Sequence, residues 1–190
     1  VDCEAGRVRG VWLQERGASR MLRTECFVNA AGPYVTAVAA QLGVELPVSC
    51  ELHLKMAFRD THAVVPRTAP LLIWDDAQTL DWSAEERELL AATPATRWLL
   101  ETLPAGAHGR PEGGRESDRV LLLWPYHSTP VEPQFPLPED ALFPEIALRG
   151  MSRMLPGLRS YYGSLPRAQT DGGYYVKTRE NRCLVGPLPV

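Results

Sequence analysis

The side chains that most often bind metals or act as nucleophiles are scattered along this chain. The cysteines show no C-x-x-C pair, and the histidines show no H-E-x-x-H spacing that would place two ligands on one helix face. No serine lies in a G-x-S-x-G sequence. The spacing therefore predicts no metal site, no dithiol redox centre and no hydrolase nucleophile.

Aromatic residues are a second group that could do chemistry. Trp124 and Tyr126 follow an apolar run, and they could form the walls of a substrate pocket or pack in the core, which is the commoner fate. Tyr174 and Tyr175 are adjacent, so on a strand only one of them can face a cavity. The nearby basic residues Lys177, Arg179 and Arg182 are most simply explained as a solvated hairpin turn.

Composition limits the classes of protein that this chain can belong to. Of its 190 residues 45% are hydrophobic and 23% charged, which is typical of a globular protein. The net charge of −3 argues against a general nucleic-acid binder. No apolar run approaches the roughly 18 residues of a membrane span, and no signal peptide is recognised. Sparse cysteines favour reduced thiols, so we expect a cytoplasmic protein, and the absent initial methionine suggests a fragment.

The N-terminal part predicts a hairpin followed by a helix. Residues 7–14 and 20–31 read as two strands around Gly17, with the second strand entering a sheet interior at Phe27 and Val28. A helix is expected from about Pro33 to Leu42, with Gly43 as its stop.

The remaining chain predicts mixed strands and helices. Strands are expected near residues 50–60, 71–76 and 120–128, and two more within 172–187, joined by a turn at Glu180-Asn181. On the first of these, Leu52, Leu54 and Met56 share one face, and His53 and Lys55 share the other. One helix is expected with Ser83 and Glu86 as its capping box, and another is expected to begin near Pro144. Between them we expect an exposed loop at 104–117 and an irregular proline-rich segment at 129–138. This order predicts an α/β (mixed α+β) fold, and other α+β folds would also produce it.

Two segments resemble a known family. Residues 25–48, ECFVNAAGPYVTAVAAQLGVELPV, resemble the "NAAG" strand end, helix and "P-V" exit of FAD-dependent oxidoreductases of the D-amino-acid oxidase/glycine oxidase/sarcosine oxidase superfamily. Residues 172–189, GGYYVKTRENRCLVGPLP, are similar to the return strand of the same superfamily. The resemblance implies a partial FAD-binding Rossmann-like domain at 1–46, an inserted substrate-binding domain on an antiparallel sheet at 47–170, and return strands at 171–190.

The resemblance also implies site residues. Asn29, Ala30, Ala31, Gly32 and Pro33 would lie beside the FAD, where small side chains and a helix N-terminus suit a bulky ligand with a pyrophosphate. An ordinary tight strand–helix turn is the alternative explanation. Position 175 is an arginine in the amino-acid oxidases and a tyrosine in the sarcosine-oxidase-like branch, so Tyr175 is a candidate catalytic and substrate-binding residue. The branch often attaches flavin through a cysteine at the position of Gly173, so a covalent link is impossible there.

Further implied residues lie on the neighbouring strand and in the aromatic group. His53 and Lys55 would be catalytic candidates, because a cation near the flavin stabilises the charge that develops on reduction. The alternative is a solvated face of an edge strand. Trp124 and Tyr126 would contact the substrate.

The activity that the resemblance implies is oxidation of a C–N bond in an amine or amino acid, by hydride transfer to non-covalent FAD. The G-x-G-x-x-G fingerprint of such proteins is absent from the sequence, so we expect the chain alone to bind FAD poorly and to be inactive. A non-catalytic α/β binding or interaction module that has lost the cofactor site remains the alternative. The sequence leaves the oligomeric state open.

Overall fold

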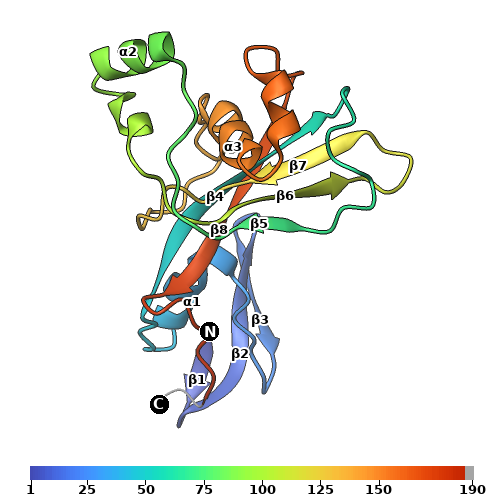
Figure 1. Cartoon of the computed structure of the whole chain (residues 1–190). Coiled ribbons are helices and arrows are strands. Elements are labelled where there is room, and N and C mark those ends of the chain that lie inside the picture. The colour runs from blue at the N-terminus through green and yellow to red at the C-terminus, as the bar shows by residue number, and fades with distance from the viewer. Residues whose placement is uncertain (187–190) are drawn as a thin grey trace. The chain divides into compact units, whose positions relative to one another are not determined.

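The chain divides into two units in the computed structural model, which describes residues 1–186. The first unit contains residues 1–51, 130–133 and 174–186, and the second contains Leu52–Thr129 and Gln134–Gly173. Mixed helices and two antiparallel sheets confirm the general α+β expectation (Figure 1).

The first unit contains a three-stranded sheet in the order β1-β2-β3, with strands β1 (Asp2–Glu4), β2 (Arg7–Glu15) and β3 (Ala18–Arg23). The expected hairpin is confirmed, but its second strand ends at Arg23 and does not continue to Ala31. The side chain of Thr24 accepts a hydrogen bond from the amide of Cys26 and donates one to its carbonyl, so the chain turns there. Val28 is 77% exposed and enters no sheet interior, which corrects that prediction.

A short helix follows the irregular segment. A 3-10 turn, η1 (Gly32–Tyr34), leads into α1 (Val35–Ala40), so the expected helix exists but is shorter than predicted. Its stop at Gly43 is confirmed, since this residue adopts a φ of +70°. The first unit buries few residues: Gly10, Ala39, Val44 and Cys50.

A five-stranded sheet has the order β5-β6-β7-β4-β8. Its strands are β4 (Val48–Arg59), β5 (Leu72–Trp74), β6 (Ala107–Glu112), β7 (Arg119–Leu123) and β8 (Gln169–Thr178). β4 and β8 each contribute residues to both units. The second strand expected after Glu180-Asn181 is not formed over residues 182–186, and residues 187–190 lie outside the described part of the chain.

Strand β6 contradicts the prediction of an exposed loop at 104–117. Small residues allow it to pack between β5 and β7, since Ala107 and Gly109 are buried and a Cβ on Gly109 would lie 2.6 Å from Leu122 Cδ2. Pro111 is tolerated because β5 pairs only with the Ala107–Gly109 part of β6.

The helices of the second unit are α2 (Ala84–Ala92), η2 (Arg97–Leu100), α3 (Phe143–Ser152) and η3 (Pro156–Tyr161). The predicted capping box is confirmed: Ser83 Oγ accepts from the Glu86 amide, and the Glu86 carboxylate accepts from the Ser83 amide. The start of α3 beside Pro144 is confirmed as well. The proline-rich segment from 129 to 138 contains no helix or strand, as expected.

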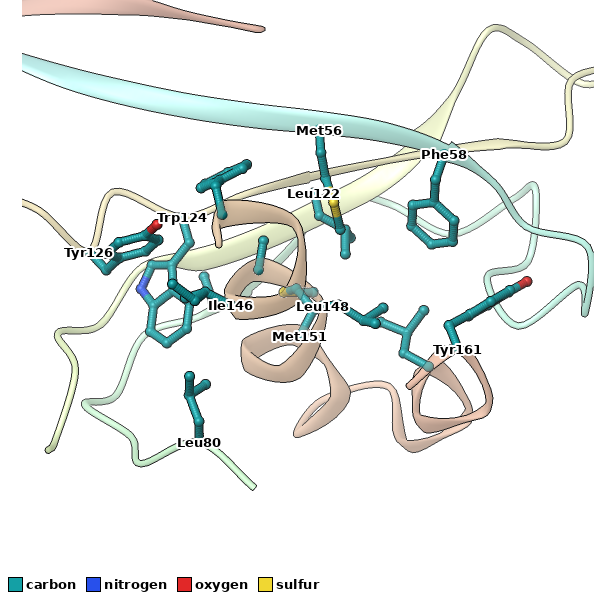
Figure 2. Close-up of a cluster of buried hydrophobic side chains, with 14 of the residues drawn as sticks. Met56, Phe58, Leu80, Leu122, Trp124, Tyr126, Ile146, Leu148, Met151 and Tyr161 are labelled. Atoms are coloured by element: carbon teal, nitrogen blue, oxygen red, sulfur yellow. The ribbon is translucent and has the colours of Figure 1, made fainter. Parts of the chain in front are cut away.

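The core of the second unit lies between the sheet and α3. Figure 2 shows Met56, Phe58 and Leu122 of the sheet on the side where α3 places Ile146 and Met151, and all five are fully buried. The predicted alternation of β4 is confirmed by Met56, whereas 42% of the neighbouring Lys55 side chain is exposed. Over residues 1–186 no helix has the length and apolarity needed to span a membrane.

Candidate functional site

The turn at Asn29–Pro33 is built around the side chain of Asn29. Its Nδ2 donates to the Val35 carbonyl at 2.8 Å, and its Oδ1 accepts from the Ala31 amide at 3.2 Å. These bonds fold the backbone back on the start of α1. Gly32 has a φ of +54°, which favours glycine, and a Cβ built on it would meet no atom within 4 Å. The asparagine thus fixes the turn ahead of the helix.

We expect Asn29→Ala to loosen this turn. The variant removes an acceptor for Ala31 and a donor to Val35, which together stabilise the unit by about 1–2 kcal/mol. Amide hydrogen exchange should accelerate over residues 31–36, while exchange in β6 stays unchanged. Asn29→Asp should be almost as damaging, because a carboxylate oxygen would face the Val35 carbonyl. Unchanged exchange in both variants would show that the turn does not need the side chain.

A cavity of about 590 Å³ lies in the first unit. Its apolar walls come from α1, from the approach to β4, and from β8 and the segment after it: Val35, Leu46, Val48, Val176, Leu184 and Val185. Lys177 and Arg182 also line it. Both segments that carry the family resemblance therefore contribute to one cavity.

A smaller cavity of about 250 Å³ lies in the same unit and shares Val35, Val48 and Val176 with the first. Pro33 and Cys50 also line it. The Cys50 thiol lies 3.6 Å from the Pro33 carbonyl and donates to it. Burial, and secondarily the charge of Glu132, raises the pKa of this thiol, so Cys50 stays protonated and acts as a structural contact.

The two adjacent tyrosines of β8 differ in their exposure to solvent. Tyr175 is 54% exposed, whereas Tyr174 is half-buried, as alternation requires. No atom lies within 4 Å of a Cβ built on Gly173. The expectation that the basic cluster is simply solvated is wrong for Lys177: its Nζ pairs with Glu51 Oε2 at 2.7 Å, and only 24% of its side chain is exposed.

The other predicted site residues belong to the second unit. Lys55 Nζ forms an ion pair with Asp171 Oδ2 at 3.1 Å, and the backbone amide of Gly172 and this lysine lower the pKa of Asp171. His53 lies on the same strand and is half-buried. Thus Asn29–Pro33 and Tyr175 share one unit, and His53 and Lys55 lie in the other.

The aromatic candidates Trp124 and Tyr126 lie in the core of the second unit. Their rings meet edge to face at 5.8 Å, and the two residues are 1% and 7% exposed. Trp124 Nε1 donates to the Pro104 carbonyl, and the Tyr126 hydroxyl donates to Asp140 Oδ2 at 2.6 Å. Burial and this carboxylate raise the pKa of Tyr126, so its hydroxyl stays protonated. Their contacts are those of packed core residues.

The sequence interpretation missed a cluster around Arg149. The guanidinium lies between the rings of Trp82 and Tyr162, at 3.9 and 4.3 Å from their centroids. It pairs with Glu86 and with Glu145, each at 2.5 Å, and donates to the Asp81 carbonyl. The i,i+4 spacing of Glu145 and Arg149 on an otherwise apolar helix was the available signal. A cavity of about 510 Å³ adjoins this cluster.

Among residues 1–186 no three His, Cys, Asp or Glu side chains gather where they could hold a metal ion. Of the two cavities described above in the first unit, we take the one of about 590 Å³, which Val35 lines, as the candidate ligand site. Compared with family models, curated proteins and solved structures, the chain matches none.

Proposed function

We propose that the chain is part of a flavin-dependent oxidoreductase that oxidises a C–N bond of an amine or amino acid by hydride transfer to FAD. The observation that carries the proposal is the shared cavity. Val35, Leu46 and Val48 come from the first resembling segment, and Val176, Lys177 and Arg182 come from the second, more than 120 residues later in the sequence. The meeting of these two segments at one cavity supports the proposal, because in the resembled family both segments lie near the flavin.

The residues present fit one part of FAD. A volume of about 590 Å³ with aliphatic walls lies in the range of small-molecule sites and suits a planar ring system. The pyrophosphate has no equivalent partner, because the sequence lacks G-x-G-x-x-G and α1 has only six residues. When bound, FAD would accept the hydride. The proposal therefore needs a dinucleotide-binding loop that these 190 residues do not contain.

The side chains of this chain would then form the wall of the site that holds the flavin ring and would set the charge at its edge. The Asn29 turn would hold Val35 at the wall of the cavity, and the Glu51–Lys177 pair would keep a cation fixed at its edge. Tyr175 would face solvent beside Val176, where a substrate could reach it. His53 and Lys55 lie in the second unit, and their catalytic assignment depends on the resemblance alone.

Titration with riboflavin, followed by flavin fluorescence, tests the ring site. We expect measurable binding of riboflavin, and FAD that binds no more tightly, because the phosphates find no partner. Val176→Asp should weaken riboflavin binding more than tenfold by placing a charge on the apolar wall. Leu22→Asp is the matched control, since Leu22 is similarly exposed and lines neither cavity of this unit. No riboflavin binding, or equal losses in both variants, would contradict the proposal.

A non-catalytic binding module is the second candidate. The missing fingerprint favours it, as does Tyr175 in place of a carboxylate-binding arginine. The coding sequence upstream of Val1 separates the two: a strand, G-x-G-x-x-G and an acidic residue about 20 positions later would support the enzyme.

A further inference from the structure

We propose that the 590 Å³ cavity of the first unit selects small apolar anions, such as aryl carboxylates or sulfonates, over neutral molecules of the same shape. The selection comes from Arg182. No flavin takes part in it, so its test can succeed or fail whatever the riboflavin titration shows.

Among residues 1–186, the wall of the cavity combines aliphatic side chains with two cations and no carboxylate. The apolar part of a ligand would gain free energy by leaving water and packing against the aliphatic wall, which consists of Val35, Leu46, Val48, Val176, Leu184 and Val185. The two cations, Lys177 and Arg182, differ in whether a carboxylate already neutralises them. Glu51 already neutralises Lys177 through the 2.7 Å ion pair. The guanidinium of Arg182 makes no hydrogen bond or ion pair to any residue between 1 and 186, so its charge is available to a ligand.

The backbone holds Arg182 in place at the cavity. The Thr178 hydroxyl accepts from the Arg182 amide at 2.9 Å and donates to the Arg182 carbonyl at 2.7 Å. The Asn181 amide donates to the Thr178 carbonyl at 3.0 Å, and Asn181 adopts a φ of +52°. This closed turn fixes the Cα of the arginine, so part of the ordering cost of binding is met before the ligand arrives.

Two fluorescent probes of nearly the same shape separate charge from apolar contact. The anion is 8-anilinonaphthalene-1-sulfonate, and its neutral counterpart is N-phenyl-1-naphthylamine. We expect the wild-type chain to bind the anion more tightly than the neutral probe. Arg182→Gln should weaken anion binding about fivefold, the value expected for one exposed charge at about 4 Å, and leave binding of the neutral probe unchanged.

Two further variants complete the test. Thr178→Val opens the turn but keeps the charge, so it should produce a smaller loss for the anion alone. Arg179→Gln is the matched control, since it removes a cation from the same turn that does not line the cavity, and it should bind both probes like wild type. If a variant still binds the neutral probe like wild type, its cavity is intact. Unchanged anion binding in Arg182→Gln, equal losses for both probes, or an equal effect of Arg179→Gln would overturn the proposal.

Discussion

Replacing Arg149 by methionine should lower the free energy of unfolding of the second unit by about 3 kcal/mol, which is the range for breaking a buried ion pair by removing one partner. Only 4% of the Arg149 side chain is exposed, and it satisfies Glu86 and Glu145 together. Methionine would fill most of the volume but leave both carboxylates facing each other without a cation. It would also remove two guanidinium–ring stacks.

Urea unfolding followed by tryptophan fluorescence measures this effect in the second unit, because every tryptophan except Trp12 belongs to it. Arg153→Met is the matched control. Arg153 lies directly after α3, and its guanidinium is 5.4 Å from the Trp74 ring centroid, without an ion pair among the described residues. We expect its loss to stay below about 1 kcal/mol. Equal losses in both variants would mean that the Arg149 carboxylate pairs contribute nothing.

Replacing Gly150 by alanine should destabilise the second unit by about 2–3 kcal/mol, the cost of overpacking a well-packed core. Alanine has the better helix propensity by about 1 kcal/mol, so propensity alone predicts the opposite sign. The new Cβ, however, would lie 2.4 Å from Cζ3 and 2.6 Å from Cε3 of Trp124. That indole is fully buried and bound to Pro104, so it has nowhere to move.

The same unfolding measurement checks this prediction, with Gly173→Ala as the control. Gly173 lies in β8, its φ is not positive, and an added Cβ meets no atom within 4 Å. We expect a change within about 0.5 kcal/mol there. A Gly150→Ala variant that matches or exceeds the wild-type stability would show that Trp124 can shift, and that the core is looser than its burial implies.

Local sequence signals predicted those elements whose causes are local. The capping box at Ser83 and Glu86, the helix start at Pro144 and the alternation of β4 each depend on residues a few positions apart. Strand β6 could not be found in this way. It lies within the glycine-rich, proline-containing segment 104–117, which has the composition of a loop, and only the neighbouring strands β5 and β7 make an extended conformation favourable.

The candidate site was predictable in a similar, partial way. The NAAGP segment indicated a turn, and the structure adds the two hydrogen bonds of Asn29 that hold it. The role of Lys177 was not predictable, because its partner Glu51 is 126 positions away in the sequence. The Arg149 cluster likewise joins Glu86 and Arg149, 63 positions apart, so spacing along the chain could reveal only its Glu145 contact.

The small number of buried residues in the first unit has a consequence for ligand binding. Gly10, Ala39, Val44 and Cys50 provide little apolar burial, so this unit should open at a lower free energy than the second. A ligand in its cavity would cover aliphatic side chains that are partly or fully exposed among residues 1–186, and would add apolar burial to this unit. Binding and folding of this unit are then thermodynamically linked, and each increment of affinity adds directly to its stability.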